Sequence, residues 1–186
     1  MDTPLILPHT NGQFSLFKAP IYNVKPAGIV NLPNVHDIIT SDCYKPITEH
    51  LRCITNQKES RLFKKQNFDC VTFAGVFDTR KEETLIALSG LLCMGIDCKH
   101  DIEELFQKLL RDPYFETQLL FRSASGRGVK WVIKTDTAAP FSDFALAVLR
   151  YVKQTYKVWR NGYILNPSCA CYLPFDPQAL INPKLR

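Results

Sequence analysis

The sequence predicts an α+β fold built around one core. Amphipathic helical patterns over 101–112 and 140–156 alternate with apolar runs of strand length. The 186 residues, 46% of them hydrophobic, suffice for one core but are too few for two independent domains. We therefore expect a single domain over 1–186, with an N-terminal helical extension over 1–67 and an α+β core over 68–186.

The first third of the chain predicts short helices. An extended segment over 14–22 is followed by apolar residues at helical spacing within 34–66. Lys64 and Lys65 close this helical region, where positive charge is favourable to the helix dipole. A basic end of this kind is typical of a solvated helix terminus.

The core shows a more regular order. Residues 68–77 are rich in β-branched and aromatic side chains and predict a strand that ends in a turn. The next predicted elements are strand, helix, strand, strand, helix and strand, over 89–97, 101–112, 117–123, 129–135, 140–156 and 169–175. This βαββαβ order predicts a ferredoxin-like or RRM-like palm core over about 90–176. Two helices would cover one sheet face and leave the other for a partner, as in polymerase palms and RNA-recognition modules.

Local signals support these elements. Asp101 with Glu104 three residues later is a helix-start pattern, and Pro140 is tolerated in a first helical turn. Lys130 and Lys134 alternate with apolar residues, so the lysines should share one sheet face. Trp131 should then face the core.

Charge and cysteine content narrow the partner and the compartment. The net charge of +5 and the pI of about 8.8 favour an anionic partner such as nucleic acid, nucleotide or phosphate. The seven cysteines are scattered and odd in number, which is typical of thiols in a reducing compartment. Without a signal-peptide pattern or a membrane-spanning run, we expect a soluble cytoplasmic protein with no membrane partner.

Two cysteine patterns raise the question of zinc. Cys169 and Cys171 form a Cys-x-Cys pair, and Cys98 lies two residues before His100. Neither spacing recurs as the matched pair that structural zinc sites need. We expect buried thiols instead of a zinc site.

Several blocks of the chain resemble a known family in the same order. The blocks are FSLFKAPIYNVKP, VTFAGVFDTRK, SGLLCMGID, LLFRSASGRGVKWVIK and ACYLPFDPQALINPK. Together they resemble the VirE N-terminal domain family, which is related to the archaeo-eukaryotic primase (prim-pol) superfamily. The resemblance runs from about residue 14 to the C-terminus, and it implies a primase-like domain with a role in DNA-related or mobile-element processes.

The resemblance also implies where a metal site would lie. The family's Asp-x-Asp pair falls on Gly95 and Asp97, and its Asp-x-x-Arg pattern falls on Asn166 and Cys169. Because missing carboxylates leave the charge of phosphoryl transfer unneutralised, the resemblance implies a catalytically degenerate member. Mg²⁺ or Mn²⁺ would be a cofactor only of an active enzyme, with Asp97 as the residual acid and metal ligand. From the residues alone, a single aspartate at a strand end is more typical of a cap or a turn.

The glycine turn of the family is present. Its Ser-x-Ser-Gly-x-Gly-x-Lys pattern falls on Ser123, Ser125, Gly126, Gly128 and Lys130. Backbone N–H groups of such a turn can surround a phosphate, and Arg122, Arg127 and Lys130 would add positive charge. The competing interpretation is a hairpin loop whose glycines supply positive φ. With the resemblance, we expect these residues to bind the phosphate of a nucleotide or nucleic acid.

Two alternatives stay open. The first is an active primase or nucleotidyltransferase, in which Asp97 acts with other acids such as Asp78, Asp101 or Asp176. The second is a protein-interaction module that uses the same groove for a protein partner. Metal binding would favour the first, and salt-sensitive nucleic-acid binding would argue against the second.

Overall fold

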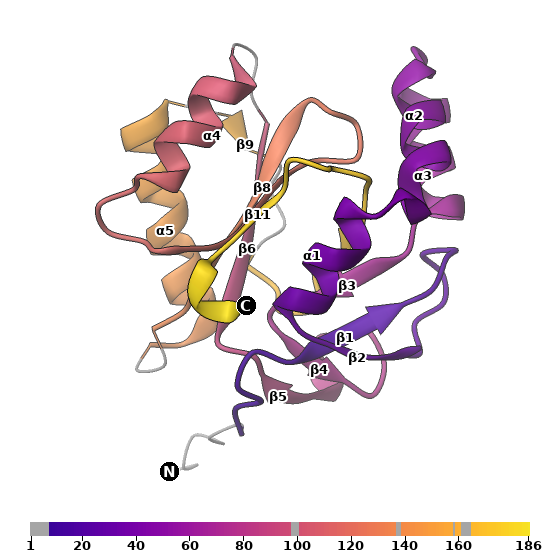
Figure 1. The fold of residues 1–186 in the computed structure, drawn as a ribbon. Helices are drawn as coiled ribbons and strands as arrows, with labels where there is room; N and C mark the ends of the chain where they lie inside the picture. Colours follow the sequence, from indigo (N-terminus) through magenta and orange to yellow (C-terminus); the bar gives the residue numbers. More distant parts are fainter. Residues whose placement is uncertain (1–7, 98–100, 137–138, 158, 161–164) are drawn as a thin grey trace.

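The computed structural model describes residues 8–97, 101–136, 139–157, 159–160 and 165–186. This described part of the chain is mixed α/β, with five α-helices and three antiparallel sheets (Figure 1). No helix within it is long and apolar enough to cross a bilayer. The pattern Cys98 with His100 lies outside the described residues.

The N-terminal half builds a small sheet and three helices. The sheet has the order β10-β3-β1-β2, from β1 (Phe14–Phe17), β2 (Gly28–Val30), β3 (Cys70–Thr72) and β10 (Cys171–Tyr172). The helices, with one 3-10 turn, are α1 (Leu32–Thr40), η1 (Asp42–Tyr44), α2 (Lys45–Cys53) and α3 (Gln57–Asn67). The predicted short helices over 34–66 are therefore confirmed. Asn31 and Asn56 start α1 and α3 by accepting hydrogen bonds from backbone N–H groups of the first turn.

The single strand expected over 68–77 is two strands. After β3 the chain turns, and β4 (Gly75–Phe77) leaves that sheet to pair with β5 (Leu85–Leu88), which follows η2 (Glu82–Thr84). Thr72 Oγ1 donates to the Gly75 carbonyl across the turn at 3.1 Å. A side chain at Gly75 would collide with the β5 backbone, so the glycine permits this pairing.

The C-terminal half builds a five-stranded antiparallel sheet with the order β11-β7-β8-β6-β9. Its strands are β6 (Leu91–Asp97), β7 (Thr117–Arg122), β8 (Gly128–Lys134), β9 (Trp159–Arg160) and β11 (Leu180–Ile181), and η3 (Pro183–Leu185) ends the chain. The two predicted helices are α4 (Ile102–Leu110) and α5 (Phe141–Tyr156). Asp101 caps α4, since its Oδ1 accepts from the N–H groups of Glu103 and Glu104.

One expected strand lies elsewhere. The run 169–175 was predicted to pair within this sheet, but its strand β10 pairs with β3 in the other sheet. The place beside β6 is taken by β9. Cys171 and Leu173 from this run are buried with residues of the N-terminal half. A short apolar run indicates that a strand is buried, but it does not indicate which strand is its neighbour. The pairing of β10 with β3 could therefore not be predicted from the pattern.

The five-stranded sheet is covered on both faces (Figure 1). Met94 and Trp131 lie on one face and pack with α4 and α5. Leu119 and Val132 lie on the opposite face and pack with α1 and the N-terminal sheet. The prediction that this second face is open to a partner is therefore wrong over its apolar centre. Trp131 is fully buried as predicted, and its Nε1 donates to Thr117 Oγ1 at 2.8 Å.

Candidate functional site

The turn between β7 and β8 is a closed hairpin turn. The Ser123 N–H donates to the Gly128 carbonyl at 2.7 Å, and the Gly126 N–H donates to the Ser123 carbonyl at 2.8 Å. Ser123 Oγ and Ser125 Oγ lie 3.3 Å apart. The N–H groups of Ser123 and Gly126 therefore point back into the turn and are not available to a phosphate.

The two glycines of the turn serve different purposes. Gly126 has a φ of +70°, a conformation that glycine adopts without strain. Gly128 instead permits a close approach, since a Cβ there would lie 2.9 Å from the Cα of Asp97 and collide with the Ile96 carbonyl. The hairpin interpretation, in which the glycines supply positive φ, is thus correct for Gly126. Gly128 instead allows β8 to lie close to β6.

Arg122 is bound to two acids. Its guanidinium donates to Glu103 Oε1 and Oε2 at 2.5 and 2.6 Å, and its Nη1 donates to Asp176 Oδ1 at 3.1 Å. Asp176 is buried, and its Oδ2 also accepts from the Arg122 N–H at 2.6 Å. The sequence around the turn contains no acid, but the fold brings these two from α4 and the C-terminal segment. The charge of Arg122 is therefore already neutralised in this structure.

Helix α2 supports the turn from the other side. Arg52 Nε donates to the Ala124 carbonyl at 3.4 Å. Ala124 is buried together with Leu51 of α2 and Phe68 at the end of α3. Helices α2 and α3 therefore stand beside the β7–β8 turn (Figure 1).

This packing gathers positive charge from α3, the turn and β8. We call Arg61, Lys64, Arg127 and Lys130 the basic cluster. Burial lowers the pKa of Lys64, and the positive charges of Lys130, Arg61 and Arg127 lower it further, against an opposing effect of Asp97. The charges of Arg61, Arg127 and Lys130 thus act on Lys64, and a surplus of positive charge of this kind attracts anions.

Lys130 extends from β8 into a pocket. It pairs with Gly95 across the strands, and its Nζ lies 2.6 Å from where a Cβ of residue 95 would be. Burial lowers the pKa of Lys130, but the nearby Cys171, Cys93 and Cys169 with Asp97 outweigh it, so the net pKa is raised. Lys130 consequently keeps its positive charge inside the pocket.

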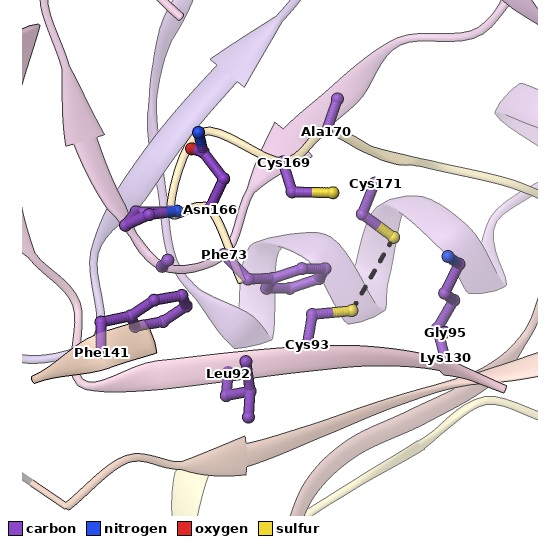
Figure 2. Close-up of a pocket in the computed structure, with 12 residues that line it drawn as sticks. Phe73, Leu92, Cys93, Gly95, Lys130, Phe141, Asn166, Cys169, Ala170 and Cys171 are labelled. Atoms are coloured by element: carbon purple, nitrogen blue, oxygen red, sulfur yellow. Dashed lines mark hydrogen bonds between the residues drawn. The ribbon is translucent and has the colours of Figure 1, made fainter. Parts of the chain in front are cut away.

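The pocket holds about 160 Å³ and is lined by apolar side chains and thiols (Figure 2). Its lining residues are Phe73, Ala74, Leu92, Cys93, Gly95, Lys130, Phe141, Asn166, Pro167, Cys169, Ala170 and Cys171. Asn166 is fixed by a hydrogen bond that its Nδ2 donates to Glu82 and by two that its Oδ1 accepts from Ser168. At positions 95 and 166 the family has acids and this chain does not. Both positions line this one pocket.

The acids that the active-enzyme alternative names beside Asp97 have other partners. Asp97 ends β6 opposite Gly128, and its charge acts on Lys64 and Lys130. Among the described residues, no three His, Cys, Asp or Glu side chains are placed to hold a metal ion. Asp78 pairs with Lys25 at 3.0 Å, while Asp101 caps α4 and Asp176 binds Arg122. Each of these three acids therefore has a role of its own in the fold, and the active-enzyme alternative stays a prediction.

The sequence interpretation missed the contribution of α3. It found Arg127 and Lys130 but treated Lys64 as part of an ordinary helix end, and it did not single out Arg61. The signal available was their spacing of three residues, which places both on one helix face. Only the tertiary packing shows that this face meets the turn.

These features define a mixed α/β domain that carries a basic cluster beside a thiol-lined pocket. A family model described as the BT4734-like N-terminal domain matches residues 63–180, which is more than half of the chain. The chain belongs to the BT4734-like N-terminal domain family. No curated protein and no solved structure matches it.

Proposed function

We propose that this chain is a catalytically degenerate primase/polymerase-like domain that binds the phosphates of nucleotide or nucleic acid. The ordered blocks that resemble the VirE N-terminal domain family support this proposal, and they suggest a role in DNA-related or mobile-element processes. The two alternatives, an active nucleotidyltransferase and a protein-interaction module, become outcomes of the tests below.

The sheet order supports a palm-like core. Read from its β9 edge, the sheet runs β9-β6-β8-β7, with α4 and α5 on one face. We infer from this order a ferredoxin-like βαββαβ unit whose fourth strand is β9. β11 is then an addition at the far edge, and the N-terminal half covers the face opposite the helices.

The pocket supports the loss of catalysis. Where the resemblance expects a metal-binding carboxylate, residue 95 has no side chain and the Lys130 ammonium fills the adjacent space. A cation there would repel a divalent metal ion and attract a phosphate. Asn166 stands at the other position where the family has an acid. It keeps the shape of an aspartate but carries no charge.

The observation that carries the binding proposal is the basic cluster. Arg61 and Lys64 come from α3, Arg127 from the turn and Lys130 from β8. Burial lowers the pKa of Lys64, and repulsion from the other three charges lowers it further. A bound phosphate would relieve that repulsion and accept charge-assisted hydrogen bonds. Arg122 is left out of this binding set, because Glu103 and Asp176 already hold it.

A titration with labelled single-stranded DNA, single-stranded RNA and nucleoside triphosphate tests the binding proposal. The double variant Lys64→Met, Arg127→Ala should bind at least ten-fold more weakly, since each charge-assisted contact contributes on the order of 1–3 kcal/mol. Wild-type affinity for an oligonucleotide should also fall steeply as salt rises, because binding releases counterions.

The matched control is the double variant Lys134→Ala, Lys153→Ala. Both lysines are exposed and lie outside the basic cluster, and the variant loses the same formal charge. An equal loss of affinity in both variants would mean that only net charge matters. Absence of binding in the wild-type protein would favour the protein-interaction module.

The loss of catalysis has its own test. Purified protein with Mg²⁺ or Mn²⁺, nucleoside triphosphates and a single-stranded template should form no dinucleotide and no extension product. A template-dependent product that disappears in Asp97→Ala would establish the active-enzyme alternative instead.

A further inference from the structure

Three thiols and one ammonium group share the pocket. Cys93 lies on β6, Cys171 on β10 and Cys169 just before it, and Lys130 reaches in from β8 (Figure 2). Cys93 Sγ lies 4.0 Å from Cys171 Sγ, at the distance of a thiol–thiol hydrogen bond. The two cysteines belong to different sheets, so the packing of the two halves of the molecule brings them together.

The two sulfurs have unequal acidity. A hydrogen bond from the Cys93 thiol lowers the pKa of Cys171, and the Lys130 ammonium lowers it further against the effect of burial. The hydrogen bond to Cys171, together with burial, raises the pKa of Cys93. Cys171 is thus the better nucleophile of the pair, because the thiolate is the reactive form of cysteine.

We propose that Cys93 and Cys171 form a redox-active dithiol that a small hydroperoxide oxidises to a disulfide, with Lys130 as the counter-ion of the attacking Cys171 thiolate. The pocket is partly open to solvent, and its lining includes partly buried Cys93 and Cys169 together with buried Cys171, so a small peroxide that enters it meets the sulfurs. None of the six described cysteines forms a disulfide in this structure.

The reaction takes place in two steps. The Cys171 thiolate attacks one peroxide oxygen, so that an S–O bond forms, the O–O bond breaks, and the leaving alkoxide or hydroxide takes up a proton. Cys93 then gives up its proton and attacks the sulfenic sulfur, which forms the S–S bond and releases hydroxide that is protonated to water. The sulfurs must approach from 4.0 Å to about 2 Å for this bond to form.

Peptide mapping after treatment with hydrogen peroxide tests the proposal. Trypsin places Cys93 with Cys98 in peptide 82–99 and Cys169 with Cys171 in peptide 161–184. The background Cys98→Ser, Cys169→Ser leaves one cysteine in each peptide. The expected product is a cross-link between these peptides that is two hydrogens lighter than their sum and is cleaved by a thiol reductant.

Further variants separate this pair from its neighbours. The cross-link should disappear in Cys93→Ser and in Cys171→Ser, and it should persist when the exposed Cys43 and Cys53 are replaced by Ser. Lys130→Met should slow its formation about ten-fold, as expected if the thiolate fraction falls, and Lys130→Arg should restore the rate. The background protein and the lysine variants are first checked for an unchanged circular dichroism spectrum. Absence of the 93–171 cross-link from folded peroxide-treated protein, or an unchanged rate in Lys130→Met, would overturn the proposal.

Discussion

At the residue scale, Arg122 shows how the fold changes the meaning of a sequence motif. It belongs to the phosphate-binding pattern that the resemblance implies, but two carboxylates of different exposure hold it. The Asp176 side chain is 3% exposed, whereas the Glu103 side chain is 64% exposed. The two pairs therefore differ in what they contribute to stability.

Replacing each acid by its amide should separate these contributions. Asp176→Asn should lower the free energy of unfolding by about 2–3 kcal/mol, because it removes the charge of a buried acceptor of two Arg122 hydrogen bonds. Glu103→Gln should cost less than about 1 kcal/mol, since an exposed ion pair contributes little. Urea denaturation measures both values. Equal effects of the two variants would show that Arg122 is not anchored mainly by Asp176.

The turn glycines show what could be predicted from sequence at this scale. Positive φ is a local property, and the hairpin interpretation predicted it for the turn; Gly126 adopts it. The role of Gly128 is a close contact with β6, which lies far away in sequence. The partners of Arg122 are likewise distant, so neither feature could be predicted from the residues around the turn.

At the element scale, α3 illustrates the same limit. This helix was predicted only as part of the short helices over 34–66, and the direction of its basic face depends on how α2 and α3 pack against Ala124. The helices of the core and the β7–β8 hairpin were predicted closely, since their capping and alternation signals are also local. The partner of strand β10 was not predicted, because strand pairing depends on residues that are far apart in the sequence.

The position of Lys64 leads to a prediction that would not hold for a lysine at a solvated helix end. Lys64→Met keeps the apolar stem and removes a charge whose pKa is lowered by burial and by positive neighbours. The free protein should therefore gain stability, seen as a higher Tm, while its affinity for oligonucleotide should fall about ten-fold. Thermal unfolding and a binding titration of the same samples measure the two effects.

The pH dependence of the gain in stability follows from the direction of the pKa shift. The folded protein releases the Lys64 proton at lower pH than the unfolded chain does, so the penalty is complete below the folded pKa. The advantage of Lys64→Met should fade as pH rises through that pKa. Lys58→Met, on the same helix but exposed, is the control and should change neither stability nor affinity appreciably. A loss of stability in Lys64→Met would contradict the repulsion on which the basic cluster is based.

At the scale of the whole molecule, the N-terminal half packs against one face of the five-stranded sheet of the C-terminal half. The N-terminal half supplies α3 and covers one face of the five-stranded sheet (Figure 1). The C-terminal half supplies the turn and, on β8, Lys130. The sequence predicted an extension over 1–67 and a core over 68–186, but β3 and β10 from that core pair in the N-terminal sheet. It predicted an open sheet face because the apolar residues of that face are covered only by packing between the halves. The basic cluster lies where these halves meet, and its α3 part was therefore beyond prediction.

The most direct test of the central claim is to locate the bound ligand by NMR. Backbone amide shifts of labelled protein are followed while a short single-stranded oligonucleotide is added at low salt. The account predicts that the largest shifts fall on the basic cluster, at Arg61, Lys64, Arg127 and Lys130, and that Lys134 at the other end of β8 is little affected. Saturable binding whose shifts lie elsewhere, for example along β11 and α4, would contradict the claim that this cluster is the phosphate-binding site.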